Sequence, residues 1–189
     1  FNEVTLLPST IKSVKSLTRF SNELARQSVV SLDAAIKDRL VTDVAAKLDT
    51  AFIAGTGDSG TTPKGILNYT GAQEITAVGA PGLDAILDAW GKLLAANVNT
   101  ASTKWLMRPE TFVALRKVKQ ATGSNGYVLT PDPTQDGVFR LFGSQVIITN
   151  RIPVTGTTTK TTQAVLADFS QIAVARDQAP TVKILDQTF

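Results

Sequence analysis

The clearest hydrophobic pattern in the chain lies between Ser31 and Ala54. Apolar residues recur there every four positions, which places them along one side of a helix with charged residues on the other side. This apolar stripe consists of Leu32, Ile36, Leu40, Val44, Leu48 and Phe52. No Gly or Pro interrupts the segment before Gly55, and glycine commonly follows a helix end. The pattern predicts a helix over 31–54 that is roughly 35 Å long at about 1.5 Å per residue, a strut within so small a protein.

Shorter patterns predict further helices and strands. Apolar residues from Leu83 to Leu94 at helical spacing predict a second amphipathic helix, and Pro109 at a first-turn position introduces a third over 110–120. Apolar runs predict strands at 3–19, 66–67, 104–108, 145–149, 163–168, 171–175 and 181–185. Trp90 and Trp105 lie among Leu and Ala, which favours places in the core. Because helices and strands are mixed without regular alternation, the predicted fold class is α+β.

Two long loops separate these elements, at 55–65 and 121–137. The first is rich in Gly and Thr, and the second is dense in Gly, Pro, Asp and Asn. Long exposed loops that join rigid elements often carry contacts. The residues chosen as possible contacts between subunits are Gly55, Gly57, Asp58, Lys64, Asn125 and Tyr127. The alternative, left equally open, is that both loops are flexible connections without a contact role.

The composition removes most catalytic chemistry. The chain has neither cysteine nor histidine, so disulfides, thiolate nucleophiles, cysteine-held metals and the usual general base near neutral pH are excluded within it. Serine–histidine and cysteine–histidine nucleophilic sites are excluded for the same reason. We therefore expect a protein that is not an enzyme, with no catalytic, cofactor-binding or metal-binding residues.

The glycines at 55–60 match the dinucleotide-binding pattern G-x-G-x-x-G. That motif needs a strand before it and a helix after it, so that the helix N-terminus faces the pyrophosphate. Here the predicted helix precedes the glycines and Thr-Thr-Pro follows them. The spacing also resembles the start of a P-loop, but Thr61 occupies the position that requires Lys. A nucleotide-dependent enzyme is the alternative from another class, and a nucleotide titration would test it.

The acidic residues and the net charge indicate no specific ligand. Asp33, Asp38, Asp43 and Asp49 alternate with basic residues along the long helix, as on a solvated face with ion pairs. Asp132 and Asp136 lack the graded oxygen ligands of a calcium loop. The net charge of +3 is compatible with a nucleic-acid neighbour without sequence recognition. No apolar run approaches the roughly 18–20 residues that span a bilayer, so we expect no membrane partner.

Three segments resemble those of one known family. They are RFSNELARQS at 19–28, AFIAGTGDSGTTPKGIL at 51–67 and FRLFGSQVIITNRIP at 139–153, and KWLMRPETFVALRKVK at 104–119 agrees with them. In their order and spacing they resemble the HK97-like major capsid proteins of tailed phages, over essentially the whole chain. No single motif is as diagnostic as a metal signature.

The resemblance implies an HK97-like fold. Its peripheral domain would comprise residues 1–67, with the spine helix at 31–54. An axial domain would follow at 68–167, and 168–189 would return to the peripheral strands. The implied function is that of a structural subunit of a tailed-phage or prophage capsid, which self-assembles into hexamers and pentamers around double-stranded DNA.

The resemblance also implies partners and a location. The partners would be further copies of the chain, scaffolding and portal proteins, and packaged DNA bound without sequence recognition. The location would be the virion, assembled in the cytoplasm of a bacterial host. An encapsulin, which encloses a cargo protein in a shell of the same fold, is the alternative.

We expect the chain to be a fragment, because it begins at Phe1 and stops at Phe189 on strand-like segments. The resemblance places the family's N-terminal arm and E-loop before Phe1. Some relatives join subunits by a bond between Lys and Asn, assisted by Glu. The Lys would fall before Phe1 and the other two after Phe189, so the resemblance assigns that role to no residue here.

Overall fold

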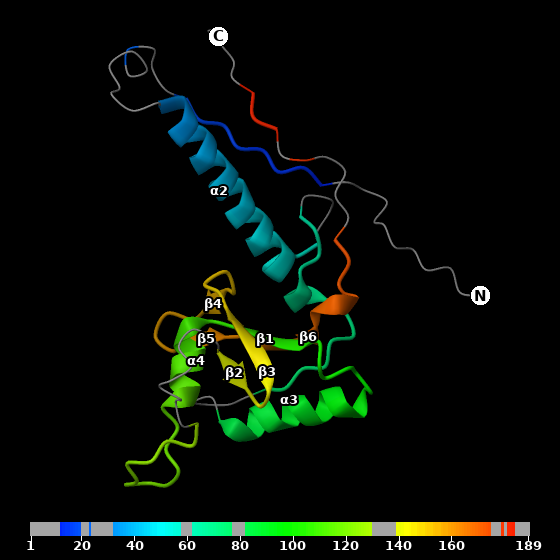
Figure 1. The fold of residues 1–189 in the computed structure, drawn as a ribbon, viewed down its shortest axis with the longest axis vertical. Coiled ribbons are helices and arrows are strands. Elements are labelled where there is room, and N and C mark those ends of the chain that lie inside the picture. Colours follow the sequence, from blue (N-terminus) through cyan, green and yellow to red (C-terminus); the bar gives the residue numbers. More distant parts are fainter. Residues whose placement is uncertain are drawn as a thin grey trace, which may run out of the picture. The chain divides into compact units, whose positions relative to one another are not determined.

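The computed structural model describes residues 12–19, 23, 32–57, 62–76, 82–129, 139–174, 179 and 181–183. The chain divides into two compact units (Figure 1). Unit 1 comprises Phe1–Asn68 together with Val174–Phe189, and unit 2 comprises Tyr69–Ala173. The chain therefore leaves unit 1 after its long helix, forms unit 2 without interruption, and returns to unit 1.

Unit 1 is dominated by helix α2, Leu32–Ala54, which confirms the helix predicted from the stripe. The stripe residues between Ile36 and Phe52 are half-buried, and Ile53 is the one hydrophobic residue that the described part of this unit buries. On the polar side the Arg39 guanidinium pairs with the Asp43 carboxylate at 3.2 Å. Asp38 and Asp49 are exposed and Asp43 is partly exposed, so these three acidic residues lie on a solvated face as predicted, and the side chain of Asp33 lies outside the described part of the structure.

Unit 2 is built on a four-stranded mixed sheet in the order β2-β3-β1-β6. The strands are β1 (Thr103–Met107), β2 (Arg140–Leu141), β3 (Ser144–Ile148) and β6 (Val165–Asp168). Strand β1 runs parallel to β3 and antiparallel to β6, and its Trp105 lies level with Val146 and Leu166. A parallel pair needs a crossover connection, which here contains helix α4 (Pro109–Arg116).

Helices α3 (Leu83–Ala95) and α4 cover one face of this sheet. Side chains alternate across a strand, so Trp105 and Met107 of β1 point to the same face, where Phe112 and Leu115 of α4 and Ile86 of α3 meet them. The full buried cluster is Ile86, Trp105, Met107, Phe112, Leu115, Leu141 and Val146. The core position of Trp105 is confirmed, whereas Trp90 is half-buried.

The loop between β3 and β6 holds a small hairpin in a Thr-rich segment. Strands β4 (Val154–Thr155) and β5 (Thr161–Thr162) pair there, and Gly156 takes a positive φ of 86° in the turn. Arg108 links the segment before β4 to the start of α4. Its guanidinium donates to the carbonyl oxygens of Asn150 and Ile152, each at 2.8 Å, and pairs with Glu110 at 3.1 Å.

Two predicted elements differ because hydrogen bonds between residues ten or more positions apart favour another structure. Residues 66–67 belong to the 3₁₀ helix η1 (Ile66–Asn68) rather than to a strand, since the Asn68 amide folds back to donate to the Ala54 and Gly55 carbonyls. Helix α4 ends at Arg116, not at residue 120. The chain beyond it forms a hairpin, in which the Val128 N–H donates to the Val118 carbonyl.

The predicted strands near the two ends are not formed where the structure describes them. Residues 12–19 and 181–183 belong to no strand. Gln171 is the last residue of the 3₁₀ helix η2 (Phe169–Gln171), and residues 172–174 have no regular structure. The Asp168 carboxylate accepts a hydrogen bond from the Ser170 N–H at 3.0 Å, which stabilises this turn. The remaining parts of these predictions lie outside the described residues.

Candidate subunit-contact sites

The glycine loop after α2 closes on itself. Thr56 and Lys64 form an antiparallel bridge, and the Gly65 N–H donates to the Gly55 carbonyl at 2.8 Å. Gly55 and Gly65 are both buried at this crossing. A Cβ atom at Gly65 would lie 2.6 Å from the Ile53 carbonyl oxygen, and one at Gly55 would overlap the carbonyl oxygens of Ala51 and Pro63. These two glycines therefore allow a close approach of backbones.

Two of the candidate contact residues on this loop are exposed. Gly57 has a positive φ of 73°, which glycine adopts readily, and the Lys64 side chain packs under it while remaining exposed. Gly55 is buried. Asp58 lies outside the described residues. The geometry also differs from a dinucleotide site, because α2 precedes the glycines and the element that follows them is the three-residue η1.

The candidates Asn125 and Tyr127 lie together on unit 2, on the hairpin that follows α4. Lys119 pairs with Tyr127 across this hairpin, and its ammonium lies 3.5 Å from the centroid of the Tyr127 ring. The same ammonium donates to the Asn125 carbonyl at 3.3 Å. Lys119 was not among the predicted contacts, although the run of bases from Arg116 to Lys119 is visible in the sequence.

A groove of about 340 Å³ lies beside this hairpin and is lined by Val113, Arg116, Lys117 and Tyr127. Val113 and Tyr127 are 47% and 41% exposed. The Arg116 guanidinium lies 5.6 Å from the centre of the Phe112 ring, a cation–π arrangement that fixes the side chain at the groove. The groove thus combines an apolar floor with cationic edges, and we name it the α4 groove.

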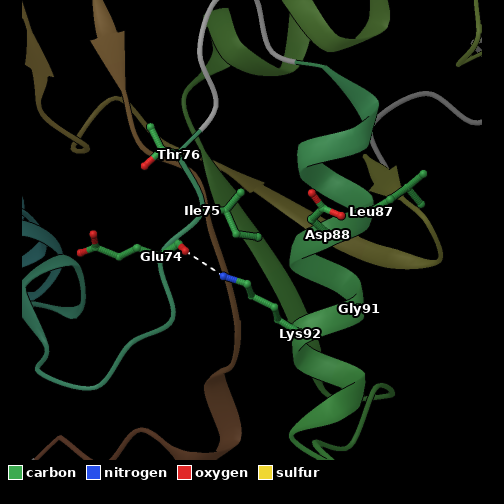
Figure 2. Close-up of a pocket in the computed structure, with 7 residues that line it drawn as sticks. All are labelled: Glu74, Ile75, Thr76, Leu87, Asp88, Gly91 and Lys92. Carbon is green, nitrogen blue, oxygen red and sulfur yellow. Dashed lines mark hydrogen bonds between the residues drawn. The ribbon is translucent and has the colours of Figure 1, made fainter.

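A larger open cavity of about 530 Å³ lies along α3 (Figure 2). Lys92 reaches from the helix to the neighbouring extended segment and donates to the Glu74 carbonyl at 2.9 Å. Leu87 lines this cavity and is 49% exposed, and Leu94 is 55% exposed. The sequence pattern placed both leucines on the apolar side of this helix, but in the structure they are exposed at the surface.

Perturbed carboxylates in unit 2 have structural causes. The Arg108 guanidinium beside Glu110 lowers the pKa of that carboxyl group, and hydrogen bonds from Ser170 and Ser102 lower the pKa of Asp168. Within the part of the chain that the structure describes, no three His, Cys, Asp or Glu residues gather as metal ligands would. None of the helices described there is long and apolar enough to cross a membrane.

Capsids of GTA particles are among the solved structures that share the fold of this chain. The capsid of a native GTA particle, computed with C5 symmetry, is 24% identical with a TM-score of 0.51. The match covers 70% of this chain and 48% of that chain. The capsid of an empty GTA particle, also computed with C5 symmetry, is 24% identical with a TM-score of 0.52, over 70% of this chain and 49% of that chain. This chain therefore spans about half the length of these capsid chains.

Sequence comparison places the chain in a family. No curated protein matches it. The family model described as the phage capsid family, however, matches residues 4–189. The family match covers a larger share of this chain than the structural matches do. Both kinds of match agree with the observed α+β arrangement of a long helix and a mixed sheet. The chain belongs to the phage capsid family and has the α+β fold of HK97-like capsid proteins.

Proposed function

We propose that this chain is a structural part of an icosahedral shell subunit of the tailed-phage type. In this role it associates with copies of itself into hexamers and pentamers and catalyses no reaction. The observation that carries the proposal is the match of the phage capsid family to residues 4–189. The absence of cysteine and histidine from the sequence agrees with a structural role.

The two units correspond in this proposal to the two domains of a capsid subunit. Unit 1, with α2 as its spine, is the peripheral domain, and unit 2 is the axial domain that gathers at the centre of a capsomer. The division of the chain at Asn68 and again at Val174 supports this assignment. The 23-residue length of α2 supports its role as a strut.

The proposal extends to the contents and the contacts of the shell. The shell encloses double-stranded DNA without reading its sequence, is built in the host cytoplasm with scaffolding and portal proteins, and forms the virion capsid. The net charge of +3 supports a DNA neighbour rather than a sequence-specific site. Contacts between subunits involve the two loops, where Gly57, Lys64, Asn125 and Tyr127 are exposed.

An encapsulin shell is the less favoured function. It would share the fold, but the family that matches is that of phage capsids and the matched structures are capsids of GTA particles.

Negative-stain electron microscopy of the complete gene product tests the proposal, with the protein expressed alone and with its neighbouring genes. We expect uniform polyhedral shells. Dispersed small particles under every salt and co-expression condition would contradict it. The contents of purified shells separate the two shell functions, since nuclease-protected DNA indicates a phage-type capsid and a single cargo protein indicates an encapsulin.

A further inference from the structure

The solvent-facing side of α3 carries an unusual combination of apolar and acidic residues. Positions three, four and seven apart share one side of a helix, and here these positions form a single exposed row. The row consists of Asp84, Leu87, Asp88, Gly91 and Leu94. About half of each leucine side chain is exposed although the opposite side of the helix is anchored in the core through Ile86. We name this row the α3 face.

The α4 groove has the complementary character. Its floor is formed by Val113 and the Tyr127 ring, and Val128 next to it is 39% exposed. Arg116, Lys117 and Lys119 surround this floor with positive charge. Among the residues that the structure describes, none of those lining the groove is acidic. An occupant that fits it therefore presents a branched apolar side chain flanked by carboxylates, which is the pattern of Leu87 between Asp84 and Asp88.

These two surfaces belong to one compact unit but cannot meet within one copy. Both helices are held in the same buried cluster, α3 by Ile86 and α4 by Phe112 and Leu115. Each helix therefore turns its exposed side away from the shared core. Complementary surfaces that are fixed apart on one molecule can pair only between molecules. Such a heterologous contact closes into a ring when its rotation allows.

We infer that the α3 face of one copy docks into the α4 groove of a second copy, with Leu87 on the apolar floor and Asp84 and Asp88 beside the cations. This inference rests on the proposed self-association and names the surfaces that perform it. Lys92, at the edge of the α3 face, keeps its positive charge, but its ammonium is directed to the Glu74 carbonyl at 2.9 Å rather than to the row of the α3 face. Each copy uses both surfaces at once, one toward each neighbour.

Cysteine crosslinking of the complete gene product tests this contact directly. The 189 residues contain no cysteine. Any cysteine elsewhere in the complete gene product is first replaced by serine, so that introduced pairs report only the intended positions. We expect the double variant Leu87→Cys with Val113→Cys to give, on mild oxidation, a ladder of covalent oligomers that ends at the size of a closed ring. Each single variant should stay monomeric on a denaturing gel. Leu87→Cys with Ile147→Cys is the matched control, because Ile147 is also exposed but lies on the opposite face of the sheet.

The outcomes separate this contact from the proposed function. A ladder from the double variant alone supports the inference. Dimers from Leu87→Cys alone would overturn it in favour of a symmetric α3–α3 contact, and dimers from Val113→Cys alone would overturn it in favour of a symmetric groove contact. Shells without any ladder would also overturn the inference while leaving the proposed function intact. An unsubstituted protein that forms no oligomers at all would overturn both.

A charge exchange provides a second measurement that does not depend on disulfide geometry. Asp88 and Lys117 are both exposed, so reversing either charge leaves the fold intact. We expect Asp88→Lys alone or Lys117→Glu alone to lower the oligomeric fraction about tenfold, because like charges then oppose each other across the contact. The combination of both changes should restore most of that loss. Additive loss in the double variant would overturn the pairing of these two surfaces.

Discussion

The two units of this protein differ in how they bury apolar surface. Unit 2 encloses its own core, in which Met107 is fully buried and Leu115 and Leu141 are each 1% exposed. In the described part of unit 1, by contrast, Ile53 is the one buried hydrophobic residue, and it is 9% exposed. The stripe of α2 is half-buried from Ile36 to Phe52. Among the described helices and strands, α2 makes its main contacts with the three-residue η1.

This difference assigns different sources of stability to the two units. Helical stability in proteins comes mainly from packing of the apolar face rather than from propensity. The sheet and two helices of unit 2 supply that packing to one another, whereas the described neighbours of α2 cover its stripe only in part. We therefore expect unit 2 to be stable in the free chain. Unit 1 should gain more stability from assembly than unit 2 does.

Equivalent leucine truncations in the two units should give the largest contrast. Leu115→Ala removes a fully buried side chain and should lower the free energy of unfolding by about 2–5 kcal/mol. Leu48→Ala removes a half-buried one and should cost about 1 kcal/mol. Urea unfolding measures both. Tryptophan fluorescence reports on unit 2 alone, because Trp90 and Trp105 both lie there, and far-UV circular dichroism also includes α2.

The same pair of variants can break the comparison. A loss for Leu48→Ala as large as that for Leu115→Ala would mean that the stripe of α2 is covered as completely as the core of unit 2. In assembled shells we expect the cost of Leu48→Ala to increase relative to the free chain, since neighbouring copies then add to the burial of α2.

A glycine-to-alanine substitution in each unit should give smaller changes in the free energy of unfolding, and the two changes should have opposite signs. Gly65→Ala places a Cβ atom against the backbone of Ile53 and Gly55 and should cost about 1–3 kcal/mol. Gly91→Ala is the matched control, because nothing lies within 4 Å of the added atom and the site is inside α3. It should stabilise the free chain by about 0.5–1 kcal/mol. A neutral Gly65→Ala would show that the glycine loop opens without loss of stability.

The sequence predicted the elements whose cause is local. The four-residue spacing of the stripe predicted α2 to within one residue, because a long uninterrupted period leaves few alternatives. Strand β1 and the start of α4 at Pro109 followed from an apolar run and a helix-starting proline. The α+β class followed from the order of these elements.

The errors occurred where contacts between separated residues decide the structure. Nothing in Ile66 and Leu67 themselves indicates that Asn68 will donate back to Ala54 and Gly55 and form a 3₁₀ turn. The early end of α4 likewise depends on Val128 pairing with Val118, ten residues away. Propensity and periodicity contain no information on such pairings.

The candidate contact surfaces could be predicted only in part. Loop character was sufficient to select Asn125 and Tyr127, which the structure brings together beside Lys119. It was not sufficient to select Leu87 or Leu94, because hydrophobic periodicity gives the direction of a helix face but not the width that its neighbours cover. The contact role of Gly57, Lys64, Asn125 and Tyr127 stays a prediction.

The smallest expected effect is a pH dependence confined to unit 2. The Asp168 carboxylate accepts hydrogen bonds from the Ser170 N–H and hydroxyl, at 3.0 and 2.7 Å, and these bonds with that from Ser102 lower its pKa. A lowered pKa in the folded state contributes stability that is complete above the ordinary value of aspartate and is lost as the pH falls through the lowered value. Wild-type fluorescence midpoints in urea should therefore fall more steeply below about pH 4 than those of Asp168→Asn. Equal slopes would show that the turn after β6 holds without the charged carboxylate, and that the stability of unit 2 comes from its apolar core alone.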